Sequence, residues 1–183
     1  IGDYAFDGNS LTSLVIPDNV LTIGQQAFFN NSLSSLILGD SVQTIGKWAF
    51  DENSITSLEI PDSVISVEKS AFRNNQIESL KLGTGVQTIG DYAFIGNSIT
   101  SVEFPNGIDV GLEAFVENPI QYLAFDGTYT VNADSFDSTI AVVPYGETNI
   151  GFLDWFQNLW VSDYYEAGLE YVYIPNTVIP VSY

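Results

Sequence analysis

The chain has 183 residues, of which 23 are Asp or Glu and 4 are Lys or Arg, so its formal net charge is −19. It has no Cys and no His, which excludes disulfides, catalysis by Cys or His, and zinc sites built from these residues. A negative field of this size repels nucleic acid and anionic membrane surfaces, and we expect neither as a partner.

One apolar phrase recurs from the first residue onward. It begins with Ile or Val, continues in most copies with Gly and two variable residues, and ends in Ala-Phe. The copies occupy residues 1–6, 23–28, 45–50, 67–72, 89–94, 110–115 and, more loosely, 131–136. The first four steps are 22 residues and the next two are 21. A fixed apolar period in the twenties predicts a repeat solenoid of about seven coils.

A second phrase, with the spacing L-x-x-L-x-L, lies between the copies of the first. It begins at Leu11, Leu33, Ile55, Ile77, Ile99 and Ile120. Its last two apolar residues share one face of a strand, and Pro or Gly follows in most copies and ends that strand. Coils stacked about 4.8 Å apart would join these strands into one continuous parallel sheet. We predict that the Ala-Phe pairs form the opposite wall of the core.

A column of Asn residues follows the Phe column at a distance of three residues. Its members are Asn9, Asn31, Asn53, Asn75, Asn97 and Asn118. A polar side chain this close to the core needs hydrogen bonds, because an unsatisfied buried group costs roughly 1–3 kcal/mol. We therefore predict an asparagine ladder that binds turn backbone in its own coil and in the adjacent one.

The combined pattern L-x-x-L-x-I-P-x-x-V-x-x-I-G-x-x-A-F resembles the BspA-type, or Treponema-type, leucine-rich repeat of bacterial surface proteins. The resemblance covers residues 1 to about 136. It implies a mainly β, right-handed leucine-rich-repeat solenoid with a cell-surface or secreted role in adhesion. The chain differs from the family pattern at the Asn column, where the family often has Cys.

The period breaks after residue 136. We predict an aromatic-rich C-terminal cap over residues 137–183, in which residues 169–178 return once to the repeat phrase, because solenoid ends expose core and strand edges. Alternatively, the large aromatics of this segment form an assembly surface that joins chains head to tail. They are Trp155, Phe156, Trp160, Tyr164 and Tyr165.

The chain begins inside a repeat, so we expect it to be a segment of a longer protein. No apolar run approaches the roughly 20 residues that a membrane-spanning helix needs. We therefore expect no membrane insertion within this segment.

Two rows of residues are expected to face outward from the predicted sheet. One is small and nearly constant: Ser13, Ser35, Ser57, Ser79, Ser101 and Tyr122. The other varies from apolar to charged: Val15, Ile37, Glu59, Lys81, Glu103 and Ala124. A constant row is typical of scaffold and a variable row of recognition. The varied row, with Tyr122, is our candidate ligand-binding face, and an ordinary solvated β face is the alternative.

Three aromatic residues recur inside the first phrase, at Tyr4, Trp48 and Tyr92, and polar residues occupy the coils between them. Stacking would place Tyr4 and Trp48 about 10 Å apart. Aromatics at this spacing could stack on sugar rings of a glycan. The alternative is that they pack beside the Ala-Phe wall.

Three acidic residues, Asp18, Asp40 and Asp62, follow the predicted strand in successive coils. Like charges about 5 Å apart repel by roughly 0.8 kcal/mol in bulk water. Bound calcium would relieve this repulsion, and splaying of the carboxylates into solvent would relieve it as well. We expect no other cofactor.

These observations predict an extracellular or cell-surface module without enzymatic activity. The acidic residues lie mostly at turn and outward positions rather than as one unique pair, which disfavours glycosidase chemistry. The leading hypothesis is adhesion or protein recognition through the sheet face, with a protein or glycan partner. The alternative is a structural subunit that binds copies of itself end to end in a filament or sheath.

Overall fold

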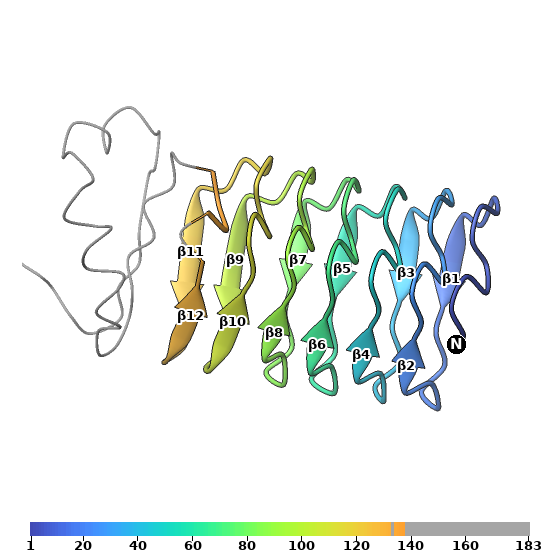
Figure 1. Cartoon of the computed structure of the whole chain (residues 1–183), viewed down its shortest axis with the longest axis horizontal. Coiled ribbons are helices and arrows are strands. Elements are labelled where there is room, and N and C mark those ends of the chain that lie inside the picture. The colour runs from blue at the N-terminus through green and yellow to red at the C-terminus, as the bar shows by residue number, and fades with distance from the viewer. Residues whose placement is uncertain (133, 138–183) are drawn as a thin grey trace, which may run out of the picture.

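The computed structural model describes residues 1–132 and 134–137, which form an elongated solenoid of short parallel strands (Figure 1). These residues hold twelve strands, two in each of six coils. The prediction of a leucine-rich-repeat solenoid is confirmed. The number of coils is slightly smaller than the predicted seven, because the seventh copy of the first phrase only begins a further turn with Val131 and Phe136.

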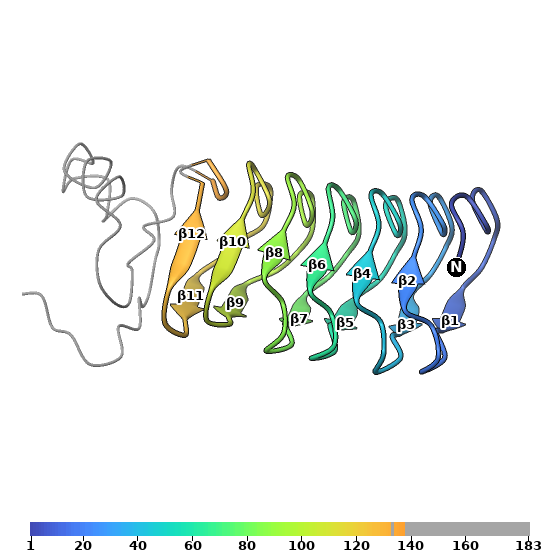
Figure 2. The ribbon, with the colours of Figure 1, turned by 60° about the horizontal axis from the view of Figure 1, so that its bottom comes forward.

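The strands form two rows that run along the length of the solenoid (Figure 2). The first row follows the L-x-x-L-x-L phrase: β1 (Ser13–Val15), β3 (Ser35–Ile37), β5 (Ser57–Glu59), β7 (Ser79–Lys81), β9 (Ser101–Phe104) and β11 (Tyr122–Phe125). The second row directly precedes the repeated Ala-Phe phrase: β2 (Thr22–Ile23), β4 (Thr44–Ile45), β6 (Ser66–Val67), β8 (Thr88–Ile89), β10 (Ile108–Val110) and β12 (Tyr129–Val131).

The continuous sheet is formed by the second row and not by the first. The six even-numbered strands of the second row pair in one parallel sheet. The first row is instead divided into the pairs β1–β3, β5–β7 and β9–β11. The prediction of one continuous sheet along the first row was therefore wrong. Pro61 follows β5 and Pro105 follows β9, the strands that come after the gaps between β3 and β5 and between β7 and β9. The first row is interrupted at these two junctions.

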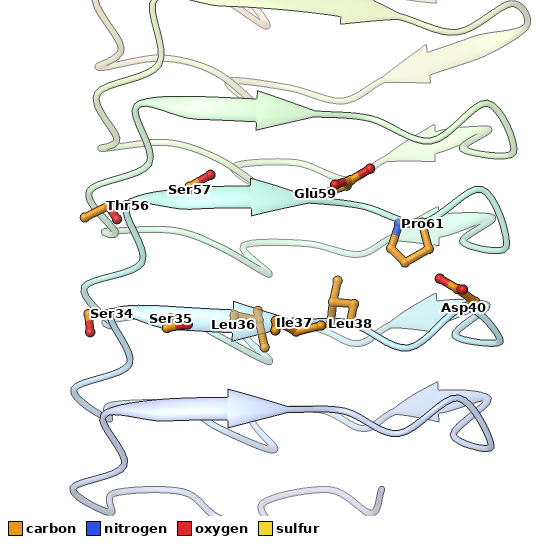
Figure 3. A pocket seen from close by; sticks show the side chains of 10 residues that line it. All are labelled: Ser34, Ser35, Leu36, Ile37, Leu38, Asp40, Thr56, Ser57, Glu59 and Pro61. Carbon is orange, nitrogen blue, oxygen red and sulfur yellow. The ribbon is translucent and has the colours of Figure 1, made fainter.

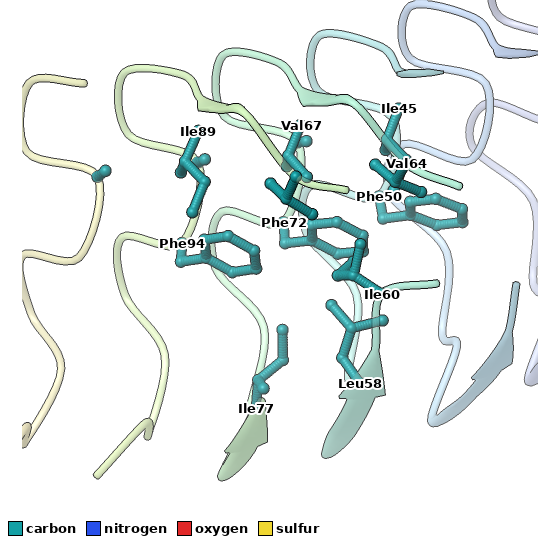
Figure 4. Packing of buried hydrophobic residues seen from close by; sticks show 14 of the residues in the cluster. Ile45, Phe50, Leu58, Ile60, Val64, Val67, Phe72, Ile77, Ile89 and Phe94 are labelled. Carbon is teal, nitrogen blue, oxygen red and sulfur yellow. The ribbon is translucent and has the colours of Figure 1, made fainter. Parts of the chain in front are cut away.

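The Phe column is the centre of the core. Phe28 and Phe50 lie with ring centroids 5.2 Å apart and an interplanar angle of 3°, and Phe72 and Phe94 repeat the arrangement at 5.4 Å and 5°. Figure 4 shows Phe50, Phe72 and Phe94 in one line across three coils. The separation is close to the strand spacing of about 4.8 Å, so the coil spacing sets the ring spacing. The predicted structural role of this column is confirmed.

The asparagine ladder is also confirmed, except at Asn9, whose amide donates to the carbonyl oxygen of Asp7 at 3.2 Å. The amide of Asn75 donates to the carbonyl oxygens of Phe50 (2.9 Å), Phe72 (3.2 Å) and Arg73 (3.2 Å), and its oxygen accepts the Ile55 N–H at 3.1 Å. These bonds tie each Asn to its own coil and to the preceding one. Closely matching patterns hold four other members: Asn31, Asn53, Asn97 and Asn118.

The turn that carries the Ala-Phe pair needs two left-handed backbone positions in each coil. The first is occupied by Tyr4, Gln26, Trp48, Ser70, Tyr92 and Glu113, and the second by Gly8, Asn30, Glu52, Asn74, Gly96 and Glu117. Left-handed backbone costs a residue with a Cβ roughly 1–2 kcal/mol. The sequence analysis did not predict these turns, although Gly and Asn at most second positions were a signal for them.

A buried ion pair joins two neighbouring coils. The carboxylate of Asp51 is fully buried, and Arg73 donates from Nε to both of its oxygens at 3.0 Å and from Nη2 to Oδ2 at 2.8 Å. Burial raises the pKa of Asp51, and it outweighs the opposing effect of the Arg73 guanidinium. The pair is therefore a specific link between coils in which one charge is held in an unfavourable environment.

Candidate functional site

The variable outward row lies on the exposed face of the first-row strands, as predicted. Val15 and Ile37 are cross-strand partners in the β1–β3 ladder, and their side chains are 64% and 58% exposed. Two apolar side chains this exposed and directly paired form an apolar patch at one end of the row. We call Val15 and Ile37 the apolar pair.

The next part of the same row is charged. Glu59 and Lys81 are partners in the β5–β7 ladder, and the Lys81 ammonium contacts a Glu59 carboxylate oxygen at 2.5 Å. Glu103 on β9 is exposed, and its ladder partner Ala124 on β11 is half-buried. Tyr122 begins β11. The structure therefore brings the predicted row onto one face, with its chemistry changing from apolar to charged along the solenoid.

The junctions between first-row strands follow an alternation of Pro and Gly that the sequence analysis did not use. Pro17, Gly39, Pro61, Gly83 and Pro105 succeed one another in five coils. Where Gly follows Pro the coils meet closely, since a Cβ on Gly39 would lie 2.6 Å from the Pro17 carbonyl oxygen. Where Pro follows Gly, the strands on either side form no ladder within residues 1–132. The alternation of Pro and Gly therefore coincides with open and closed junctions in turn.

The open junction between β3 and β5 contains a groove of about 580 Å³, which Figure 3 shows from the outward side. Leu36 and Leu38 are nearly buried and supply apolar surface, while Ser and Thr hydroxyl groups and two carboxylates supply polar surface. The lining residues are Ser34, Ser35, Leu36, Ile37, Leu38, Asp40, Thr56, Ser57, Glu59 and Pro61. The groove thus adjoins Ile37 of the apolar pair and continues the candidate surface.

Backbone atoms add to the binding capacity of the groove. Ser54 donates to the Leu33 carbonyl oxygen at 2.9 Å just before the two strands begin. The strands β3 and β5 themselves form no hydrogen-bonded ladder with each other. Backbone groups on their facing sides that lack a ladder partner need another one, such as water.

Two of the three acidic residues that follow the first-row strands accept hydrogen bonds from the next coil at the closed junctions. An Asp18 carboxylate oxygen accepts the Asp40 N–H at 3.2 Å, and the Asp62 carboxylate accepts the N–H and hydroxyl of Thr84 at 2.7 and 3.1 Å. The Thr84 bonds hold the pKa of Asp62 below its usual range. Residues 1–132 and 134–137 contain no group of three or more acidic side chains arranged to hold a metal ion. Calcium binding at Asp18, Asp40 and Asp62 stays a prediction.

The three turn aromatics lie in one column but do not form a single cluster. Tyr4 is exposed and its hydroxyl accepts a hydrogen bond from Gln25 at 2.7 Å, while Trp48 and Tyr92 are half-buried. Buried Ser70 occupies the coil between Trp48 and Tyr92. Glycan stacking by these residues stays a prediction, and all three occupy the left-handed turn position.

The predicted C-terminal cap falls almost entirely outside the described residues. The proposed assembly aromatics, from Trp155 to Tyr165, lie there as well, so end-to-end assembly stays a prediction. In the described part of the chain, no helix is long and apolar enough to cross a membrane.

Comparisons with known proteins agree with this geometry. The BspA-type leucine-rich repeat region matches residues 1–124 in 6 copies. Among solved structures, the chain is similar to a leucine-rich cell surface protein from Faecalibacterium prausnitzii A2-165, with 25% sequence identity and a TM-score of 0.50 over 73% of this chain. The match spans 45% of that protein's length. No curated protein matches the sequence.

Proposed function

Because this chain belongs to the BspA-type leucine-rich repeat family, we propose that it is a non-enzymatic protein-recognition module of the cell surface that binds through its first strand row. The similarity to a bacterial cell surface protein supports this location. Adhesion to a partner protein is the form of recognition that we favour. The observation that carries the proposal is the apolar pair of Val15 and Ile37 beside the open groove.

The chemistry of the surface restricts the partner. Apolar side chains at Ile37, Leu36 and Leu38 favour an apolar group in the groove. The Asp40 carboxylate lines the same groove, and the chain as a whole is strongly negative. We therefore propose an extended segment of a partner protein in which an apolar side chain lies next to Lys or Arg. Its backbone would bond with backbone groups of β3 and β5 that no ladder occupies, and its cation would be attracted by the field of the chain.

A phage-displayed library of random peptides, selected on the immobilised full chain, tests this proposal. We expect enriched peptides to combine apolar and basic residues and to lose at least about tenfold in affinity for Ile37→Asp, because a carboxylate replaces an exposed apolar contact. Asp40→Asn should reduce the affinity of these peptides less than Ile37→Asp does.

Ile65→Asp is the matched control, since Ile65 is also an exposed isoleucine (45%) but directly precedes the second-row strand β6. Peptides should bind this variant as they bind the original chain. The proposal is contradicted if no such peptides are enriched, or if Ile37→Asp and Ile65→Asp reduce binding equally.

A further inference from the structure

The four basic residues of this acidic chain lie close together in the sequence. Lys47, Lys69, Arg73 and Lys81 are the only Lys or Arg among 183 residues, and they all belong to the third and fourth coils. Two of them have carboxylate partners: Arg73 binds Asp51 and Lys81 binds Glu59. The other two, Lys47 and Lys69, are exposed, and within the described residues neither lies within 4.0 Å of a carboxylate oxygen.

The two unpaired lysines occupy the same position of the turn in neighbouring coils. Two backbone bonds fix this arrangement, from the Gln26 N–H to the Lys47 carbonyl oxygen at 2.8 Å and from the Trp48 N–H to that of Lys69 at 3.0 Å. Asp91 follows Lys69 in the same column, but its carboxylate accepts the Leu112 N–H at 3.0 Å. Lys47 and Lys69 are thus neighbours in the column, and the Asp91 carboxylate that follows them accepts a backbone hydrogen bond from the next coil.

Aromatic side chains flank the lysines. The Lys69 ammonium lies over the ring of Tyr92 at 5.2 Å from its centroid, which holds the cation in place while leaving it unneutralised. Trp48 is half-buried next to Lys47 and beside Lys69 of the following coil. Ser70, which is small and buried, separates the two aromatics. Trp48 and the two lysines therefore lie in the same turn of adjacent coils.

From this arrangement we propose a second binding site, formed by Lys47, Trp48, Lys69 and Tyr92, for an acidic oligosaccharide. The sugar ring stacks on the face of Trp48, and its carboxylate binds the two ammonium groups. A peptide carboxylate or a phosphate would use the lysines equally well but would not need the indole. The site lies in the turn that follows the second strand row and is independent of the groove between β3 and β5.

Titrating the isotope-labelled full chain with defined sugars, with the Trp48 indole N–H followed by NMR, tests this site. Loss of one signal in Trp48→Asn assigns the resonance, and Asn tolerates the left-handed backbone of this position. We expect sialyllactose or trigalacturonate to shift the signal with saturable, salt-sensitive binding. Lactose and maltotriose, the neutral counterparts, should cause no shift.

Lys69→Ala should reduce the affinity about tenfold, the effect expected for the loss of one charge-assisted bond. Lys81→Ala is the matched control because it removes the same charge from an exposed pair on the sheet face, and it should leave the affinity unchanged. The proposal is overturned if neither acidic sugar binds, or if Lys81→Ala weakens binding as much as Lys69→Ala. It is also overturned if isothermal titration calorimetry, which does not depend on the indole signal, shows that Trp48→Asn leaves the affinity unchanged while inorganic phosphate competes as well as the sugars. That result would indicate attraction to charge alone.

Discussion

The first and fourth coils contain the same residue types in the same columns, but their environments differ. Phe6 is 44% exposed, whereas Phe72 is fully buried. Asn9 donates to its neighbour Asp7 at 3.2 Å, whereas Asn75 is tied to two coils by four hydrogen bonds. Phe72 stacks on rings from both neighbouring coils, and Phe6 stacks on Phe28. The repeat residues therefore stabilise the fold through their neighbours, as expected for a solenoid.

The largest contrast should come from the Phe column. Phe72→Ala should lower the free energy of unfolding by about 4 kcal/mol, because it removes a fully buried ring and leaves a cavity between two stacked neighbours. Phe6→Ala should lower it by less than half as much, since its ring is already partly in solvent. Urea unfolding followed by circular dichroism measures both. Equal losses would contradict the stacking explanation.

The Asn column gives a second contrast. Asn75→Ala should destabilise the chain by about 3 kcal/mol, because the Ile55 N–H and up to three carbonyl oxygens lose a buried partner. Asn9→Ala, in the same column but exposed, should change stability by no more than about 0.5 kcal/mol. If both variants unfold at the same urea concentration, the ladder is not a source of stability.

Two ion pairs, each between residues 22 positions apart in the sequence, extend the comparison between buried and exposed sites. Arg73→Ala should cost about 2 kcal/mol near neutral pH, below the roughly 3–5 kcal/mol of a fully buried pair, because Arg73 is 38% exposed. Lys81→Ala breaks an exposed pair and should destabilise the chain far less than Arg73→Ala.

The cost of Arg73→Ala should also depend on pH. The pKa of Asp51 is raised from 3.8 in the folded chain, so the folded state binds this proton more tightly, and stability falls as pH rises from 3.8 through the folded pKa. Loss of Arg73 raises the pKa further. The destabilisation should therefore be smaller around pH 4 than near neutral pH, and unfolding curves at the two pH values measure the difference. A cost that is the same at both would show that Asp51 is not the group responsible.

The smallest expected effect is a gain in stability at the turns. Glu52 is exposed at a left-handed position with φ of 55°, where neighbouring coils have Asn30 and Asn74. Glu52→Asn should therefore stabilise the chain by up to about 1 kcal/mol, because Asn tolerates this backbone better. Glu78→Asn, at an exposed position outside these turns, is the control and should bring no gain. Melting temperatures of the two variants distinguish the turn effect from the loss of a negative charge.

Much of the fold could be predicted from the sequence because stacking imposes the same requirement on every coil. The Phe and Asn columns and the outward row from Val15 to Ala124 followed from spacing alone. The second-row sheet could not be predicted in this way, because strands as short as Thr22–Ile23 contain too few residues to show a period of two. The Asp51–Arg73 pair depends on two residues that do not recur, so periodicity gave no signal for it.

The groove was missed for a different reason. The Pro and Gly residues at 17, 39, 61, 83 and 105 were recognised as ends of strands, but their alternation was not followed from coil to coil. The junctions at which Pro follows Gly are the ones without a ladder, so the alternation coincides with the open junctions. A period of two coils was therefore present in the sequence and locates the surface on which the proposed function depends.

Amide hydrogen exchange tests most directly whether an open junction provides the recognition surface. Measured on the full chain, exchange should be fast for the amides on the facing sides of β3 and β5 and slow for their counterparts between β5 and β7. Addition of a peptide selected for binding should slow the first set and leave β4 and β6 unchanged. Equal protection at both junctions in the free chain, or peptide protection confined to the second row, would contradict the account.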